Sequence, residues 1–386
     1  MNVWLPTQYF PLLSCVLLWS IALGCSSPHP ADTTRPTPSA ASTEPVFVRY
    51  AQGFAIDYSE AHPVLLVQGA TDTTRYVLLP PGASAPPSAA GAAIIRTPVR
   101  RIVMTSTTHL GLLEFLDARD HLVGIGRADL VYDSAIRQRV AQGLIQEVGT
   151  DGNLNVEQVL ALQPDLVMVS ATPGVSLQQY QPLINTGIPV IVNAEWMEAS
   201  PLGKAEWVKL MAVLLQQGAQ ATRQFSAVAT RYDSLVQQAQ RVRQKPQVIT
   251  GSPFQGTWYV PGRNSYVGQL LRDAHASWPW ERDTSAVSLN VALETVYRPG
   301  LRADYWINAG TAQRLSTLAE QDERLAAFRP YQQGKVYNYY RRVRASGGND
   351  YYEGGTVRPD RVLADLVEIF HPEVLDHSLY YYQRLE

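Results

Sequence analysis

Cysteine is scarce in this chain of 386 residues, and both cysteines, Cys15 and Cys25, fall within the first 25 residues. The rest of the chain can therefore form no disulfide and can offer no thiolate to a metal. A strong charge imbalance is also lacking, since the net charge is -2 and no long basic run occurs. Nucleic acid is therefore not the expected main partner, because phosphate binding needs a concentrated positive face. A neutral or small ligand suits this composition better.

Motifs of the common enzyme classes are missing as well. The chain has no Gly-x-Ser-x-Gly elbow, no Walker loop and no His-Glu-x-x-His helix, and its one Gly-Ile-Gly, at 124–126, lacks the third glycine of a dinucleotide site. Asp350 and Glu353 could exchange protons with a substrate, but nothing in the sequence places them beside one. We therefore expect a protein without catalytic activity.

The N-terminal residues have the features of an export signal. An apolar run, FPLLSCVLLWSIALG, is too short for a comfortable membrane span and ends at Cys25. The sequence IALGC resembles a bacterial lipobox, in which Cys25 becomes the lipidated first residue, although no Lys or Arg precedes Arg35 and Ala22 stands where Leu is commoner. The alternative is a plain signal peptide that is cut nearby. Residues 1–24 are thus expected to be a lipoprotein signal peptide, and the Ser/Thr/Pro-rich residues 25–45 a flexible tether at a membrane surface.

Two kinds of pattern follow along the chain. Residues 46–96 contain short alternating runs, VFVRY, FAIDY, PVLLVQ and RYVLLP, which predict a small antiparallel β extension. From Arg100 onward, short apolar strands alternate with helices, which is the arrangement that produces a mostly parallel sheet. We expect an N-terminal α/β lobe at 97–217 and a C-terminal α/β lobe at 246–386.

A single long helix is predicted between these lobes, at 218–245. The stretch from Ala219 to Arg243 has no Gly or Pro, and its apolar residues recur every three or four positions until Pro246 ends the pattern. A helix of this length is longer than the usual crossover inside one domain. We interpret it as a rigid connection between two lobes; the alternative is an ordinary surface helix packed on one sheet.

The two lobes also contain a weak internal repeat. In the first lobe, Glu157 stands on a predicted helix that leads through Pro164 to a strand beginning at Asp165. In the second, Glu294 stands on a predicted helix, at 290–297, that leads through a proline to a strand beginning at Asp304. The spacing differs by two residues, so the similarity is local.

Three stretches of the chain resemble the periplasmic binding proteins that deliver Fe(III)-siderophores and cobalamin to ABC importers. They are RRIVMTSTTHLGLLEFLDARDHLVGIGR, VGTDGNLNVEQVLALQPDLVMVS and TWYVPGRNSYVGQLLRDA, and the resemblance extends from about Arg100 to the C-terminus. TGIPVIVNAEWMEASPLGKAEWVKL and GGNDYYEGGTVRPDRVLADLVEIFHPEVL are similar to a Bacteroidetes lipoprotein branch of that family. The resemblance implies two α/β lobes, each with a mostly parallel central sheet flanked by helices, joined by one rigid helix, with a small β extension at the N-terminus.

The same resemblance implies a place and partners for the protein. It would be a monomer anchored in the periplasm, bound to the permease and ATPase complex of an importer. In the family, one exposed glutamate on each lobe docks onto permease arginines, and the matching positions here are Glu157 and Glu294. Without the resemblance, each would be read as a solvated helix residue.

Candidate ligand residues lie in loops that follow predicted strands, where doubly wound sheets bind their ligands. Aromatic rings offer contact area with little entropy to lose, and Arg binds carboxylate or catecholate oxygens in a fork. The candidates are Arg127, Asp151, Trp196, Trp258, Tyr259, Arg341, Arg342, Tyr351 and Tyr352. Any single tyrosine among them could equally be a packing residue. His109, at a predicted helix start, is expected to be a hydrogen-bonded structural residue, because a metal site would need several His and carboxylate ligands to converge.

Two functional hypotheses follow. The first is a lipid-anchored substrate-binding protein of an ABC importer, without a cofactor, whose ligand is an Fe(III)-siderophore or, as an alternative, cobalamin or another corrinoid. The second is a surface lipoprotein that has kept the fold but not the transport role.

Overall fold

The computed structural model describes residues 44–69, 73–171 and 176–386. The predicted signal peptide, Cys25 and all but the last two residues of the tether lie outside these residues. Within the described ranges, no helix is both long enough and apolar enough to cross a membrane.

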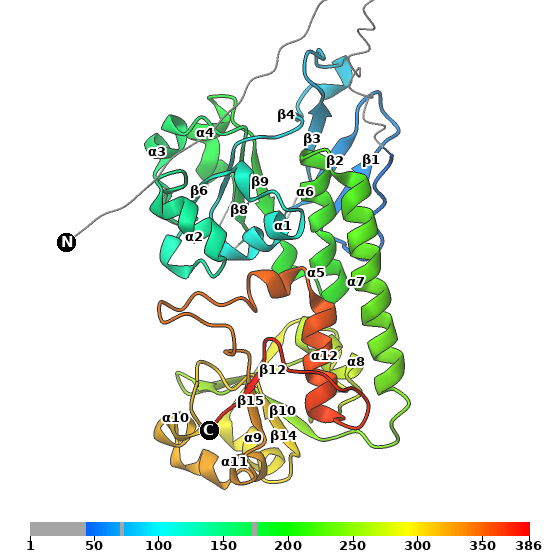
Figure 1. Ribbon diagram of the computed structural model, residues 1–386, viewed down its shortest axis with the longest axis vertical. Coiled ribbons are helices and arrows are strands. Elements are labelled where there is room, and N and C mark those ends of the chain that lie inside the picture. Colours follow the sequence, from blue (N-terminus) through cyan, green and yellow to red (C-terminus); the bar gives the residue numbers. More distant parts are fainter. Residues whose placement is uncertain (1–43, 70–72, 172–175) are drawn as a thin grey trace, which may run out of the picture. The chain divides into compact units, whose positions relative to one another are not determined.

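Four strands form a small sheet in the order β1-β2-β3-β4 (Figure 1). The strands are β1 (Phe54–Asp57), β2 (Val64–Gln68), β3 (Thr73–Leu79) and β4 (Ala93–Arg96). The first three pair antiparallel, as predicted, whereas β4 runs parallel to β3. The predicted strand VFVRY, at 46–50, does not form.

Buried charged side chains explain why VFVRY is not a strand. The backbone N–H groups of Arg49, Tyr50 and Ala51 all donate to the Glu206 carboxylate, at 2.5–3.0 Å. The Lys209 ammonium binds the same carboxylate at 2.7 Å. These donors therefore satisfy a buried carboxylate instead of pairing with a neighbouring strand.

The small sheet shares a core with the N-terminal lobe. The Tyr76 hydroxyl donates to the Val190 carbonyl at 2.7 Å, and the Phe54 ring lies 5.1 Å from the Trp207 ring, centroid to centroid. Phe54, Tyr76 and Trp207 belong to one continuous cluster of buried residues. The β extension is thus an integral layer of this lobe.

The central sheet of the N-terminal lobe is entirely parallel, in the order β7-β6-β5-β8-β9. Its strands are β5 (Ile102–Met104), β6 (Leu122–Ile125), β7 (Gln146–Glu147), β8 (Leu166–Ser170) and β9 (Val190–Asn193). β5 and β8 are buried along their whole length, as continuous apolar strands in a parallel sheet should be. Its helices are α1 (Leu110–Phe115), α2 (Ser134–Ala141), α3 (Val156–Ala161), α4 (Gln181–Ile184), α5 (Pro201–Glu206) and α6 (Val208–Leu214).

The long connecting helix forms as α7 (Gly218–Ala239). Its buried residues, which include Ala221, Phe225, Tyr232 and Leu235, are the stripe that the sequence predicts. At about 1.5 Å per residue, it spans roughly 33 Å. The helix ends six residues before the predicted end at 245, because the last turn tightens into i→i−3 hydrogen bonds such as Val242 N–H to Ala239 O.

The C-terminal lobe contains two sheets. In the order β10-β14-β15-β16, the first three strands are parallel and the last is antiparallel, while β11-β12-β13 is antiparallel throughout. The strands are β10 (Val248–Thr250), β11 (Pro253–Phe254), β12 (Thr257–Pro261), β13 (Ser288–Val291), β14 (Tyr305–Ile307), β15 (Val336–Asn338) and β16 (Gln383–Arg384). The helices are α8 (Tyr266–Asp273), α9 (Leu293–Gly300), α10 (Leu315–Gln321), α11 (Arg329–Gln332) and α12 (Pro359–Phe370).

Two predictions in this lobe are wrong. The stretch 290–297 is not one helix, because Asn290 and Val291 end strand β13 before α9 begins. Trp258 and Tyr259 are not in a loop but on β12, where Tyr259 pairs with Asn290. The alternation of Leu289 and Val291 is a strand pattern, and pairing with β12 overrides the helical tendency of the following residues.

A segment that follows β15, residues 344–356, reaches the N-terminal lobe; we call it the bridge segment. The Arg344 guanidinium donates to the Val131 carbonyl at 2.9 Å. The Glu353 carboxylate accepts the backbone N–H groups of Tyr132 and Asp133 at 2.7 and 2.9 Å. From this segment the chain enters α12, which packs along α7 (Figure 1). Two connections, α7 and the bridge segment with α12, therefore join the two lobes.

Candidate functional site

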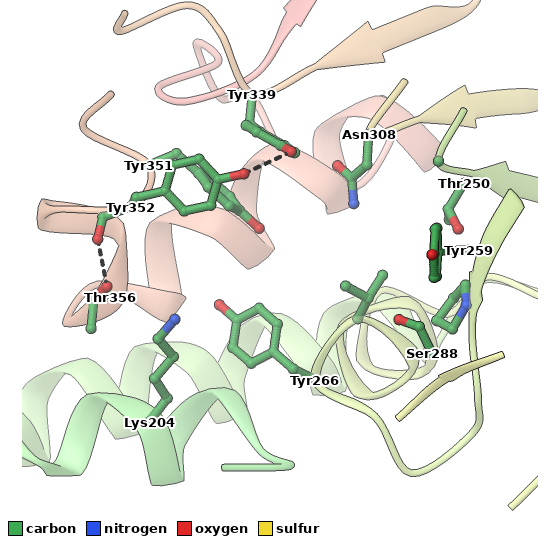
Figure 2. Close-up of a pocket in the computed structure, with 13 residues that line it drawn as sticks. Lys204, Thr250, Tyr259, Tyr266, Ser288, Asn308, Tyr339, Tyr351, Tyr352 and Thr356 are labelled. Atoms are coloured by element: carbon green, nitrogen blue, oxygen red, sulfur yellow. Dashed lines mark hydrogen bonds between the residues drawn. The ribbon is translucent and has the colours of Figure 1, made fainter. Parts of the chain in front are cut away.

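A cavity of about 270 Å³, which we call the cleft pocket, lies where α5, the C-terminal lobe and the bridge segment meet (Figure 2). The wall combines tyrosine rings, small polar groups and one cation. Its residues are Lys204, Thr250, Gly251, Tyr259, Pro261, Tyr266, Val267, Ser288, Asn308, Tyr339, Tyr351, Tyr352 and Thr356. Both lobes contribute, so a ligand here would contact both.

Tyrosines dominate the wall. The Tyr339 and Tyr351 rings are stacked, with centroids 4.4 Å apart, and the Tyr352 hydroxyl donates to the Tyr339 hydroxyl at 2.8 Å (Figure 2). Burial raises the pKa of Tyr339, Tyr351 and Tyr266. Their hydroxyls therefore stay protonated near neutral pH and can donate hydrogen bonds to a ligand.

Among the described residues of the wall, Lys204 alone carries a formal charge. Its ammonium lies 5.4 Å from the centroid of the Tyr266 ring. Burial lowers the pKa of Lys204, and the nearby Glu195 charge opposes that effect. No hydrogen bond or ion pair joins this ammonium to another residue in the described part of the chain.

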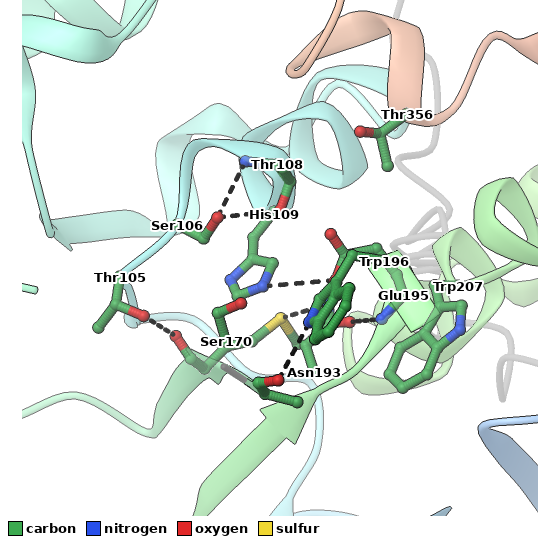
Figure 3. A network of polar contacts seen from close by, with 12 residues as sticks. Thr105, Ser106, Thr108, His109, Ser170, Asn193, Glu195, Trp196, Trp207 and Thr356 are labelled. Atoms are coloured by element: carbon green, nitrogen blue, oxygen red, sulfur yellow. Dashed lines mark hydrogen bonds and ion pairs between the residues drawn. The ribbon is translucent and has the colours of Figure 1, made fainter. Parts of the chain in front are cut away.

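A second polar cluster, which contains His109 and Glu195, lies beside α5 in the N-terminal lobe (Figure 3). His109 and Glu195 are 0% and 1% exposed, with His109 Nε2 3.8 Å from Glu195 Oε2. Among the described residues, neither side chain has a hydrogen-bond partner. Burial lowers the pKa of His109, against the opposing charges of Glu195 and Asp151. The expectation that His109 is hydrogen-bonded is therefore wrong, and in the described ranges no group of three or more His, Cys, Asp or Glu residues could hold a metal ion.

Three of the predicted ligand residues, Tyr259, Tyr351 and Tyr352, line the cleft pocket. Trp258 does not, and for it the prediction is wrong. Its side chain is fully buried against Trp306, with its N–H donated to the Thr250 carbonyl at 2.7 Å. Tyr259, the next residue on β12, points to the opposite face because side chains alternate along a strand.

The arginines and the other candidates lie elsewhere. Arg342 is paired with Asp350 at 2.6 Å and does not line the pocket. Arg341 is exposed and does not line it either. Exposed Arg127 pairs with Asp129. Trp196, which is 44% exposed, donates to the Ala171 carbonyl, and Asp151 accepts hydrogen bonds from Thr105 and Ser170. None of these residues lines the cleft pocket.

Lys204, Tyr266 and Asn308 line the pocket and were missed from the sequence. A signal existed for Asn308, because it directly follows strand β14, as ligand residues of α/β sheets often do. Lys204 stands on α5 between buried neighbours, which is unusual for lysine. No local signal marks Tyr266, which reaches the pocket through the packing of α8 against α5.

The two candidate docking glutamates are both exposed, in the first turns of α3 and α9. Arg324 lies 3.2 Å from Glu294, and a backbone hydrogen bond together with this arginine lowers the pKa of that carboxyl. The local repeat is visible in the structure. The Asp165 carboxylate accepts the N–H of Arg100 before β5, and the Asp304 carboxylate accepts the N–H of Gln247 before β10.

The sequence of residues 102–342 matches the model of the periplasmic binding protein family, which covers more than half of the chain. The chain belongs to this family. Proteins of the family bind small-molecule solutes outside the cytoplasm for ABC importers, and the family is not one of enzymes.

Individual relatives agree with this assignment. An uncharacterized lipoprotein of Methanocaldococcus jannaschii is 26% identical over 72% of this chain and 67% of its own length. A possible iron-binding periplasmic solute-binding protein of Staphylococcus epidermidis has a similar fold, with a TM-score of 0.56, 16% identity, and 71% of this chain and 99% of that one covered. A periplasmic heme binding protein of Vibrio cholerae has a TM-score of 0.53 at 18% identity, over 68% of this chain and 98% of its own. At these identities the solved structures show the fold alone.

Proposed function

We propose that this periplasmic binding protein captures a ferric chelate of the siderophore type in the cleft pocket and delivers it to the permease and ATPase of an ABC importer. The observation that carries the proposal is the wall of the pocket, on which tyrosine rings from four different segments converge. Burial raises the pKa of Tyr339 and Tyr351, so these two hydroxyls stay protonated. Such a wall binds a bulky, oxygen-rich ligand through ring contacts and hydrogen bonds, without covalent chemistry.

The size of the pocket favours a siderophore-type chelate over the corrinoid alternative. Its volume of about 270 Å³ lies just below the usual range for drug-sized ligands, about 300–1,000 Å³. A corrinoid is larger than such ligands and would need the lobes to separate, whereas two connections hold the lobes together. A compact chelate needs a smaller change.

Titration of the purified protein with a panel of ligands tests the proposal. Ferric hydroxamates, ferric catecholates, hemin and cobalamin are added separately, with binding followed by calorimetry and by tryptophan fluorescence. We expect saturable binding of at least one ferric chelate and none of cobalamin. Binding of cobalamin alone would support the corrinoid alternative, binding of hemin alone would assign a porphyrin ligand, and no binding by any of them would contradict the proposal. Native mass spectrometry of protein from its own cells would show a retained ligand directly.

We further propose that Glu157 and Glu294 dock onto the permease. Both are exposed and begin helices, one on each lobe. Replacing both with lysine should abolish uptake of the chelate while leaving its binding unchanged, because the charges meet a basic partner outside the pocket. The matched control is Glu147→Lys, also an exposed carboxylate of the N-terminal lobe. Normal uptake by the double variant would instead support a surface lipoprotein without a transport role.

Anchoring of the protein through a lipid on Cys25 is also a proposal. It is supported by the lipobox-like sequence, and one relative is named a lipoprotein. In cells, Cys25→Ala should move the protein from the membrane fraction to the soluble fraction and remove the mass of the lipid from its N-terminal peptide. An unchanged fractionation would favour the plain signal peptide.

A further inference from the structure

Lys204 differs from two other partly buried cations near the lobe interface, Lys209 and Arg342, because no hydrogen bond or ion pair joins it to another described residue. Lys209, on the following helix, is bonded to Glu206 and to the Phe47 carbonyl, each at 2.7 Å. Arg342 is bonded to Asp350 and lies over the rings of Tyr132 and Tyr380. A largely buried ammonium without a hydrogen-bonded partner is costly unless something else supplies an acceptor.

The position of Lys204 points to where such an acceptor would come from. α5 packs against α8 and against the 3-10 turn at Gly354–Thr356, and Lys204 projects from α5 into the pocket between them (Figure 2). The face of the Tyr266 ring lies beneath the ammonium, which stabilises the charge without using any of its three N–H donors. All three donors therefore remain free for a bound molecule.

The rest of the pocket supplies no second charge. The other twelve residues of the wall are tyrosines, small hydroxyl or amide residues and apolar residues. Glu195 is buried and does not line the pocket, and its charge acts on the Lys204 ammonium through its field. A polyanionic ligand would leave all but one of its charges unpaired, and a cationic ligand would be repelled.

We propose that Lys204 selects ligands that carry one anionic oxygen group, such as a carboxylate, and that the tyrosines hold the remaining, uncharged part of the molecule. That the ligand is a ferric chelate rests on the proposed function. The preference for an acidic ligand depends only on the residues of the pocket. The ligand class is thereby narrowed to a chelate with a single acidic arm, and trianionic tris-catecholate complexes are excluded.

A matched series of ferric probes tests the charge preference. Ferrioxamine B has a terminal amine, which acetylation makes neutral and succinylation makes acidic, while the iron centre is unchanged. The wild-type protein should bind the succinylated chelate about ten- to a hundredfold more tightly than the acetylated one, because a charge-assisted hydrogen bond in a buried site is strong. The unmodified amine should bind most weakly.

A pair of iron-free probes makes the test independent of the chelate. 4-Hydroxybenzoate and 4-hydroxybenzamide differ only in the charge of one group, and either fits a cavity of this size. A preference for the acid, measured by ligand-observed NMR, supports the role of Lys204 even if no ferric chelate binds, in which case only the proposed function fails. Equal binding of acid and amide, or no binding of either, overturns the inference.

Three variants assign the preference to Lys204. Lys204→Met should remove the preference for acids, and Lys204→Arg should retain most of it. Lys335→Met is the control, since Lys335 also lies over a tyrosine, 5.1 Å from the Tyr305 ring, but outside the cleft pocket. A preference that survives Lys204→Met contradicts the proposal. If that variant does not fold, the wild-type protein is acetylated with and without bound 4-hydroxybenzoate, and modification of Lys204 is measured by mass spectrometry. Bound 4-hydroxybenzoate should protect Lys204 from acetylation, and a lack of protection would overturn the proposal.

Discussion

The bridge segment lies between two pockets that differ in whether their charged side chains are paired within the protein. The cleft pocket contains a single, unpaired cation among tyrosines. The second pocket, which we call the α7-side pocket, has a volume of about 500 Å³ and is lined partly by α7. Its walls are rich in charged groups. Its residues are Glu114, Phe115, Gln224, Ala227, Val228, Arg231, Asp350, Gly354, Val357, Arg358, Asp360, Arg361, Tyr380 and Tyr381.

Most charges at the α7-side pocket are already engaged within the protein. Arg358 pairs with Asp360 at 2.7 Å, and Asp350 pairs with Arg342 at 2.6 Å. Arg231 lies 3.8 Å from the same Asp360 carboxylate. Paired groups hold the bridge segment and α12 in place, whereas unpaired groups are available to a ligand. Variants at the α7-side pocket should therefore change stability, and variants at the cleft pocket should change binding.

Glu353, which anchors the bridge segment between the two pockets, should have the largest effect. Burial raises the pKa of its carboxyl from 4.5 to about 8, outweighing the two backbone N–H donors that lower it. The folded protein then binds a proton that the unfolded chain releases, so this contribution to stability is complete below pH 4.5 and is lost as the pH rises toward 8. The loss amounts to about 2 to 5 kcal/mol across that window.

Denaturant unfolding at several pH values checks this expectation, with Glu353→Gln as the comparison. The variant should lack this part of the decline with rising pH, because its amide does not titrate. An identical pH dependence in both proteins would show that Glu353 does not titrate in this range.

Asp350→Ala should come next, with a loss of about 3 kcal/mol in the free energy of unfolding. The change removes the partner of Arg342 and the acceptor of the Gly354 N–H. The control is Asp129→Ala, which breaks the exposed pair with Arg127 and should cost less than about 0.5 kcal/mol. Equal costs for the two variants would contradict the structural role of the charges at the α7-side pocket.

Tyr351→Ala tests the other pocket. It removes a ring that is stacked on Tyr339 and lines the cleft pocket, so ligand affinity should fall about ten- to a hundredfold in calorimetry. Tyr351→Phe keeps the ring and should lose much less. An Ala variant that binds as tightly as the wild type would remove Tyr351 from the binding site.

His109 should give the smallest effect, with the opposite pH dependence to Glu353. Burial holds its pKa below the ordinary value of 6.5, so the unfolded chain takes up a proton before the folded protein does. Its contribution to stability is therefore present above pH 6.5 and is lost as the pH falls through the lowered pKa. The free energy of unfolding of His109→Leu, measured at pH 7 and pH 5, should fall less between these pH values than that of the wild type. An equal loss would place the titration elsewhere.

The alternation of strands and helices and the apolar stripe of α7 were predictable from the sequence. These features depend on neighbours within a few residues, as does the repeat around Asp165 and Asp304. The β12–β13 pairing was not predictable, because its strands are separated by more than twenty residues that give no hairpin signal.

The candidate site shows the same limit. Tyr351 and Tyr352 could be predicted because a glycine turn and a run of aromatics mark their segment. Arg342 is a residue type that often binds anionic ligands, yet here its guanidinium pairs with Asp350, eight positions along the chain, and lies over two tyrosine rings. Residue type indicates what a side chain can do, but its partners determine whether it is free to do it.

The sequence by itself determined most elements of both lobes, the continuous connecting helix and the family to which the chain belongs, because periodicity and turn residues act locally. Only the tertiary structure decided which charges are paired and which ring faces which pocket. Lys204 and Lys209 stand five positions apart, and packing alone gives one a carboxylate and leaves the other with a tyrosine face and a cavity. Contacts between distant segments decide this difference, because the desolvation of a charge depends on everything that packs around it.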